Sequence, residues 1–161
     1  MIKSLSWDEY FMAIAIVASL RSKDTNTSVG AVIVDPNKHI VATGYNGFPS
    51  GIKERELPKG RDGEWLNTKY PYTVHAELNA ILNRTSLDLY GATIYCTLYP
   101  CNECAKAIIQ SGIKEIVYLE NKHKDDDIYK ASEKLFSMTN IKIRQLNNFS
   151  KEALMIKLMT D

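Results

Sequence analysis

Hydrophobic positions in the first third of the chain change from a helical to a strand-like spacing. Four apolar residues recur at helical intervals: Phe11, Ile14, Ala15 and Ala18. Ser6 lies just before them and is a favourable N-cap, so the pattern predicts a helix over residues 7–21. The β-branched run 29–34 and the segment 40–45 flank a turn sequence at 35–38, which predicts a β-hairpin.

The second half of the chain alternates between these two spacings. We expect helices over 75–83, 102–111, 128–138 and 151–159, and strands over 93–98, 115–119 and 141–146. Gly112 stands where a glycine commonly ends a helix. Strands that alternate with helices imply parallel neighbours joined by right-handed crossovers. Together with the hairpin, this predicts an α/β fold: a three-layer α/β/α sandwich around a five-stranded mixed sheet.

Residues 46–74 form a long stretch without a sustained period. It is rich in glycine, proline and charged side chains. A loop of this length inside a compact domain is usually functional. We therefore consider a ligand-binding loop, with an ordering or subunit-interface loop as the alternative.

Composition adds limits rather than a function. The length of 161 residues, with 45% hydrophobic and 24% charged residues, predicts one folded domain over residues 1–161. Twenty Lys and Arg against nineteen Asp and Glu give a net charge of +1, so no overall field attracts nucleic acid or an anionic membrane. The apolar run 11–20 is too short to span a bilayer and does not resemble a signal peptide, so we expect a cytoplasmic protein.

The candidate chemistry lies in two short motifs. His75-Ala76-Glu77 is followed by Pro100-Cys101-Asn102-Glu103-Cys104, a pattern typical of zinc-dependent nucleobase deaminases. The two cysteines are three residues apart at a predicted helix start, so both sulfurs can face one metal ion. His75 would complete three ligands and leave the fourth position of a tetrahedral zinc open to water, as in catalytic sites.

Glu77 is the candidate general acid and base. If His75 sits at the helix cap and Glu77 in the first turn, both can reach one metal site. Glu77 could then take a proton from water and pass it to N3 of a cytosine, which assists the departure of ammonia.

The cysteines also admit other interpretations. A structural zinc requires a fourth ligand, and the donors left are Cys96, His39 and His123. Cys96 in an apolar strand is better explained as a buried inert thiol, and His39 as a surface residue. Two alternatives to an enzyme that acts on small nucleotides remain. One is a zinc-stabilised interaction module without turnover, and the other is a nucleic-acid deaminase. The latter would need a basic stripe with interleaved aromatic residues, and none is visible.

Beyond the zinc motif, the chain resembles the deoxycytidylate (dCMP) deaminase family within the cytidine deaminase superfamily. The similarity extends over about residues 5–144. The segments that carry it are 5–12, 21–24, 29–31, 44–47, 68–72 and 101–106. The resemblance implies a cytidine-deaminase-like fold, with His75, Cys101 and Cys104 as zinc ligands and Glu77 as proton shuttle. Some relatives hold a second, structural zinc in the long insertion, but residues 46–74 contain neither Cys nor His, so we expect one zinc per subunit.

The resemblance also implies a substrate site. Asn46 matches an asparagine that binds the sugar and orients the base, although an Asn before Gly47 also suits a turn. The backbone N–H of Ala76 would suit the cytosine O2, and Tyr99 could line the base pocket or be a core residue.

Two segments are candidates for contact with the substrate phosphate. Arg21, Ser22 and Lys23 match a segment beside the nucleotide phosphate in relatives, or they simply complement a helix C-terminus. The segment 121–124 departs from the family pattern, which has a tyrosine near His123. A phosphate contact by Lys122, His123 or Lys124 therefore competes with a solvated charge run.

Regulation and assembly follow from the resemblance alone. Family members are commonly hexamers, activated by dCTP and inhibited by dTTP, with Mg²⁺ accompanying the bound triphosphate. The glycine-rich loop with Gly47 and Phe48 would take part. The implied reaction converts dCMP to dUMP for thymidylate synthesis, with nucleotides as partners and no nucleic acid or membrane.

Overall fold

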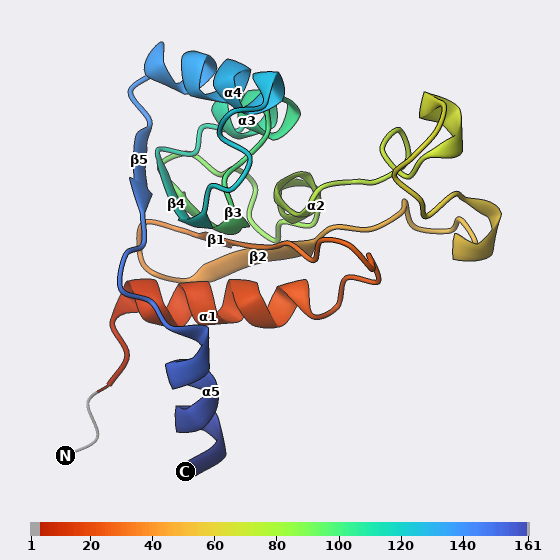
Figure 1. Ribbon diagram of the computed structural model, residues 1–161. Coiled ribbons are helices and arrows are strands. Elements are labelled where there is room, and N and C mark those ends of the chain that lie inside the picture. The colour runs from red at the N-terminus through yellow and green to blue at the C-terminus, as the bar shows by residue number, and fades with distance from the viewer. Residues whose placement is uncertain (1–3, 161) are drawn as a thin grey trace.

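The sheet at the centre of the molecule has five strands in the order β2-β1-β3-β4-β5. The computed structural model describes residues 4–160 (Figure 1). The strands are β1 Gly30–Val34, β2 Ile40–Tyr45, β3 Thr93–Leu98, β4 Glu115–Glu120 and β5 Lys142–Gln145. β1 pairs antiparallel with β2 and β3, whereas β3, β4 and β5 are parallel. The predicted hairpin and mixed sheet are confirmed.

Strand direction decides where the loops meet. Because only β1 runs opposite to the others, the segments that follow β2, β3 and β4 and the segment that precedes β1 all lie at one edge of the sheet. Asn46, Tyr99 and Asn121 begin the three following segments. This edge is where we expect a site, since ligands in α/β folds bind at the carboxyl ends of strands.

Helices cover both faces of the sheet and make three layers. α1 Trp7–Ser19 lies on one face, and α2 Ala76–Leu82, α3 Asn102–Gln110 and α4 Asp127–Ser137 lie on the other (Figure 1). α5 Lys151–Thr160 extends beyond α1. No described helix combines the length and the hydropathy needed to cross a membrane.

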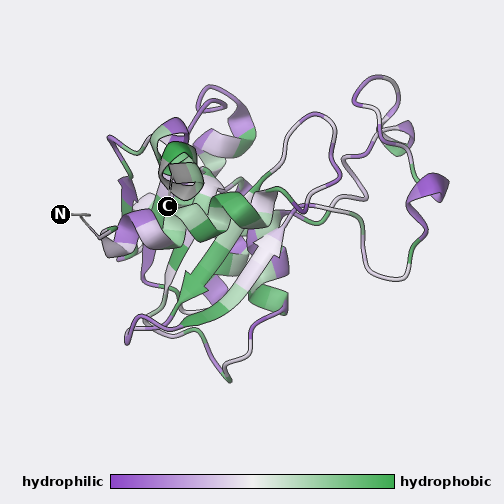
Figure 2. Cartoon of the chain, turned by 90° about the horizontal axis from the view of Figure 1, so that it is seen from below, coloured by the Kyte–Doolittle hydropathy of each residue, from purple (hydrophilic) through white to green (hydrophobic). Residues whose placement is uncertain are grey.

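The side chains of a central strand pack alternately into two separate hydrophobic cores. In β1, Val32 and Val34 pack with Phe11 of α1, whereas Ala31 and Ile33 belong to the core under the other three helices. This is the period of two that a strand buried on both faces requires. Figure 2 shows hydrophobic stretches at the middle of the sheet, whereas the long loop is largely hydrophilic or neutral.

Helix ends agree with the sequence to within two residues. Ser6 caps α1 as predicted: its Oγ accepts from the Glu9 N–H at 3.2 Å, and the Glu9 carboxylate accepts from the Ser6 N–H at 2.7 Å. α1 ends at Ser19, two residues before the predicted end at 21. Gly112 follows α3 with a φ of 83°, which is the left-handed conformation expected of a helix-ending glycine.

The long loop 46–74 projects from the sheet edge beyond α2 (Figure 1). Its ends are joined by a β-bridge in which the Gly47 N–H donates to the Val74 oxygen at 3.0 Å and the Val74 N–H returns a bond of 2.8 Å. Two short 3-10 turns, Glu54–Glu56 and Trp65–Asn67, lie within it and were not predicted. The loop therefore leaves and re-enters the body at one point.

Candidate metal centre and active site

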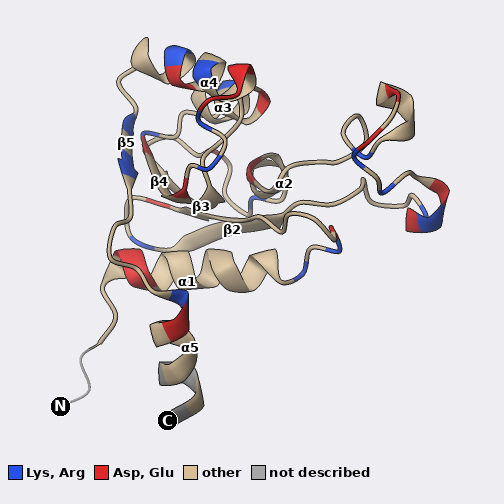
Figure 3. Ribbon diagram, in the orientation of Figure 1, with Lys and Arg blue, Asp and Glu red and all other residues tan. Residues whose placement is uncertain are grey.

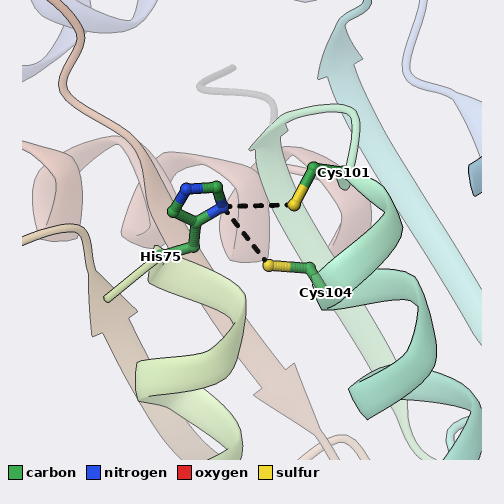
Figure 4. Close-up of side chains that lie close together, drawn as sticks. All are labelled: His75, Cys101 and Cys104. Carbon is green, nitrogen blue, oxygen red and sulfur yellow. Dashed lines mark hydrogen bonds between the residues drawn. The ribbon is translucent and has the colours of Figure 1, made fainter. Parts of the chain in front are cut away.

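Three potential metal ligands converge where α2 and α3 begin (Figure 4). Nδ1 of His75 lies 3.3 Å from Sγ of Cys101 and 3.6 Å from Sγ of Cys104. The three ligand atoms all lie within 4.8 Å of one another. The structure thus brings together the residues that the two motifs singled out.

The first turns of two helices position these side chains. His75 is the N-cap of α2 and Cys101 the N-cap of α3, both with extended backbone. Cys104 is the third residue of α3, so its sulfur returns to the same side as that of Cys101. The positive ends of both helix dipoles point towards the cluster and favour thiolate ligands.

The donor set fits a zinc ion. Zinc binds imidazole nitrogen at about 2.0–2.1 Å and thiolate sulfur at about 2.3 Å in tetrahedral geometry, so neighbouring nitrogen and sulfur ligands lie about 3.6 Å apart. The observed separations of 3.3 and 3.6 Å match this value. Two thiols with one imidazole are also soft ligands of the kind that zinc prefers.

Proton sharing within the cluster prepares it for a cation. A hydrogen bond from Cys104, together with the adjacent His75, lowers the pKa of Cys101 to about 4. The same Cys101 sulfur raises the pKa of His75 to about 9, while it raises the pKa of Cys104 above the ordinary thiol value. These shifts favour the thiolate form of Cys101.

Glu77 lies beside the cluster in the first turn of α2. Its side chain is buried, and Cys104 Sγ donates to Glu77 Oε2 at 3.5 Å. Burial raises the pKa of this carboxyl group. A carboxyl group with a raised pKa next to a metal site can both accept and return a proton near neutral pH.

A cavity of about 340 Å³ opens over the cluster. His75, Glu77 and Cys101 form its base, and Asn46, Tyr99 and His123 line its walls. The ring of Tyr99 packs edge-on against Tyr118 at 4.9 Å, and burial raises its pKa to about 12. Ala76 is buried at the start of α2, next to the ligand His75.

Asn46 joins the end of β2 to the start of β1. Its Oδ1 accepts from the Val29 N–H at 2.8 Å, and its Nδ2 donates to the Thr27 oxygen at 2.9 Å. These bonds fix the amide in the cavity wall. The asparagine therefore has a structural role whatever it contributes to substrate binding.

The segment Arg21 to Lys23 does not reach this cavity. Arg21 and Lys23 instead line a neighbouring cavity of about 160 Å³ together with Gly47 and Phe48. The Ser22 hydroxyl donates to the Asn46 backbone oxygen at 2.9 Å. The expectation that these three residues contact the substrate phosphate gains no support from this placement.

Sequence reasoning missed several residues of the larger cavity. Arg61, Lys69 and Tyr70 reach it from the long loop, Asp24 from the segment after α1, and Tyr129 from α4. Lys69 and Asp24 form a buried ion pair. The loop has no periodicity from which its inward-facing side chains could be chosen.

Cys96 stays apart from the cluster, as expected for an inert thiol. It is fully buried in β3, and burial raises its pKa well above the usual value.

Lys122 pairs with Glu120 at 3.7 Å, in agreement with a solvated charge run.

Together, the mixed sheet and a His-Cys-Cys cluster beside a buried glutamate define a zinc-binding deaminase fold. The model of the cytidine and deoxycytidylate deaminase zinc-binding region matches residues 5–120. The chain therefore belongs to the cytidine and deoxycytidylate deaminase family, and the resemblance noted from the sequence is confirmed.

Individual relatives agree with this assignment. Human deoxycytidylate deaminase is 50% identical over 142 residues, which cover 88% of this chain and 80% of the human protein. A probable deoxycytidylate deaminase of Drosophila melanogaster is 45% identical over 147 residues, covering 88% and 72%. The dCMP deaminase of cyanophage S-TIM5, solved in complex with dCMP and dUMP, superposes with a TM-score of 0.70 at 27% identity, covering 90% of this chain and all (100%) of the phage chain.

Proposed function

We propose that this chain hydrolyses dCMP to dUMP and ammonia. The observation that carries the proposal is the His75, Cys101 and Cys104 cluster with buried Glu77 beside it at the base of one cavity. The names of the human and fly relatives, and the dCMP and dUMP bound to the phage enzyme, support the choice of substrate.

In the proposed reaction Glu77 moves protons. A zinc ion held by His75, Cys101 and Cys104 would supply the Lewis acidity that activates water at neutral pH. Glu77 accepts one proton from the water whose oxygen adds to C4 and delivers this proton to N3 of the cytosine ring. It then transfers the proton of the new C4 hydroxyl to the amino group, so that the C4–N bond breaks and ammonia leaves. Its burial suits this role, because a raised pKa lets the same carboxyl group hold and release the proton.

The cavity walls are proposed to orient the nucleotide. The backbone N–H of Ala76 donates to the cytosine O2, and the Tyr99 ring packs against the base. Asn46 presents its fixed amide to the sugar.

A substrate panel tests the proposal. The purified protein is assayed with dCMP, deoxycytidine and cytosine in single-stranded DNA, and its zinc content is measured by elemental analysis. We expect about one zinc per chain and efficient turnover of dCMP only. Faster turnover of the DNA would favour a nucleic-acid deaminase, and zinc without any turnover would favour a non-catalytic interaction module.

We further propose that the smaller cavity binds the effectors dCTP, with Mg²⁺, and dTTP. Four cations line it, of which Lys23 pairs with Glu54 at 2.7 Å and Lys69 pairs with Asp24. Arg21 has no carboxylate partner among the described side chains, and Lys59 forms no salt bridge there, although its charge helps to lower the pKa of Glu54; both cations suit a triphosphate. Phe48, in the same wall, offers an aromatic face to a base.

Rate curves test this regulation. An activator must bind the active state better than the inactive one, so in a symmetric hexamer dCTP with Mg²⁺ should turn a sigmoidal dCMP curve hyperbolic, and dTTP should oppose it. Three superimposable hyperbolic curves would contradict the proposal.

Exposed apolar residues such as Val17, Leu20 and Met159 favour assembly into the proposed hexamer, and sedimentation would measure the oligomeric state.

The setting proposed for the enzyme is the cytoplasm, where it would supply dUMP for thymidylate synthesis as one deaminase domain. The three cysteines, all within the described residues, form no disulfide, which agrees with a reducing compartment.

A further inference from the structure

Two of the three basic side chains that line the larger cavity lie beside carboxylates. Outside the metal cluster, three basic side chains line it: Arg61, Lys69 and His123. Lys69 pairs with Asp24, and the two side chains are only 9% and 8% exposed. His123 Nδ1 lies 3.5 Å from Asp126 Oδ2. Within the described part of the chain, Arg61 has no carboxylate partner.

The backbone of Lys69 also binds the residue that precedes Arg61. The backbone N–H of Lys69 donates to the oxygen of Gly60, the residue before Arg61, at 2.9 Å. Asp24 in turn receives backbone N–H bonds from Asn26 at 2.8 Å and Thr27 at 3.1 Å. Arg61 is thus attached to the body of the protein through Gly60, Lys69 and Asp24, although it belongs to a projecting loop.

We propose that Arg61 recognises the 5′-phosphate of the substrate and so makes the enzyme specific for nucleotides over nucleosides. This inference rests on the proposed dCMP deaminase function. With the base at the metal cluster, the phosphate lies on the opposite side of the sugar, towards the exposed rim to which the long loop contributes Arg61.

The chemistry of the side chain fits the task. A guanidinium group donates two parallel hydrogen bonds to phosphate oxygens, and it keeps its charge at every working pH. A cation that already has a carboxylate partner must give it up before it can bind phosphate, as Lys69 would, whereas Arg61 need not. Both charge signs are spread along the loop (Figure 3), so the position of a cation matters more than the loop's net charge.

Kinetics on two substrates test the proposal. Arg61→Ala, Arg61→Lys and the control Arg55→Ala are assayed with dCMP and deoxycytidine at a fixed effector concentration. Arg55 is also exposed in the long loop but does not line this cavity. We expect Arg61→Ala to lower kcat/KM for dCMP about ten- to a hundredfold, mainly through KM, with deoxycytidine unaffected. Arg61→Lys should recover part of the loss, and Arg55→Ala should match the wild type.

The alternative outcomes separate the two proposals. Equal losses on both substrates, or no loss on dCMP, would overturn the role of Arg61 while leaving dCMP deamination intact. A wild-type protein that does not deaminate dCMP would overturn the proposed function and this inference together. Zinc content and circular dichroism of each variant identify a loss caused by misfolding, and in that case Arg61→Lys decides.

Discussion

Glu77 and Cys104 are buried and in contact beside the cavity, and the identity of each atom there matters. The carboxyl group of Glu77 is surrounded by protein and accepts one bond, of 3.5 Å, from Cys104. An amide in its place would keep the shape but could not accept a proton. This makes the glutamate the sharpest test of the proposed chemistry.

Replacing Glu77 by Gln should reduce turnover of dCMP by about a hundredfold or more, because the general base is lost while the zinc ligands remain. Steady-state rates and zinc content measured on the same preparation check this. The exposed Glu56→Gln is the matched control and should retain full activity. Near-normal turnover of the Glu77→Gln enzyme with zinc intact would remove Glu77 from the mechanism.

The two buried cysteines Cys104 and Cys96 should respond differently to removal. Cys104→Ala should lose zinc and lower the melting temperature, since metal binding is coupled to folding. Cys96→Ala should keep zinc, because this thiol lies outside the cluster and burial keeps it protonated. Elemental analysis and thermal unfolding of the two variants make the comparison, and a zinc-replete Cys104→Ala protein would contradict the ligand assignment.

Among the secondary-structure elements, the short helix α2 positions two residues of the proposed active site: His75 at its N-cap and Glu77 in its first turn. Gly44 of β2 determines how closely it packs: a Cβ there would lie 2.2 Å from the Ala76 oxygen and 2.4 Å from the Ala80 nitrogen. Both are backbone atoms, so a larger side chain can be accommodated only by moving the helix. Movement of α2 displaces His75 and Glu77 with it.

We therefore expect Gly44→Ala to destabilise the protein by about 1–3 kcal/mol and to lower activity as well, because strand and helix must separate. Urea unfolding and dCMP turnover measure the two effects. Gly60→Ala serves as the control for stability, since a Cβ at Gly60 would meet no atom within 4 Å. An unchanged urea midpoint for Gly44→Ala would show that α2 can move away from Gly44 at little cost in free energy.

These elements could largely be predicted from the sequence, because each has its own periodicity or cap. The cluster could also be predicted, since its spacing places His75 and Cys101 at helix starts. The residues of the cavity wall were harder to predict from the sequence. Arg61 and Lys69 lie in a loop without a hydrophobic period, and the direction of the Arg21 side chain after α1 depends on tertiary packing. Side chains fixed by long-range contacts rather than by local spacing are those that sequence reasoning missed.

At the scale of the whole molecule, Arg144 of β5 joins distant parts of the chain. Its Nη1 and Nη2 donate to the two Asp8 oxygens at 2.6 and 2.8 Å, and its Nε donates to Glu115 at 2.7 Å. The Tyr95 hydroxyl donates to Asp8 at 2.8 Å. Asp8 therefore connects α1 to β3 and β5.

The Arg144 hydrogen bond holds the pKa of Asp8 below its usual value of 3.8, although burial opposes it. A lowered folded-state pKa stabilises the fold above the unfolded-state value, and this contribution is lost as the pH falls through the folded-state value. Asp8→Asn should thus cost about 1 kcal/mol at pH 6–7 and progressively less below about pH 4. Urea unfolding across that range, with exposed Asp125→Asn as control, measures it. A cost that does not change with pH would exclude this ion pair as its source.

The bridge between Gly47 and Val74 has a consequence for how such an enzyme can change over evolution. Since the loop starts and ends at one point, the free-energy cost of lengthening or shortening it grows only slowly with length, and the sheet is not disturbed. Provided that Lys69 keeps its anchor, insertions elsewhere in the loop can reshape the rim of the cavity while the deaminating centre stays intact. New substrate preferences are thus accessible by exchange of one surface segment, without any need to rebuild the chemistry beneath it.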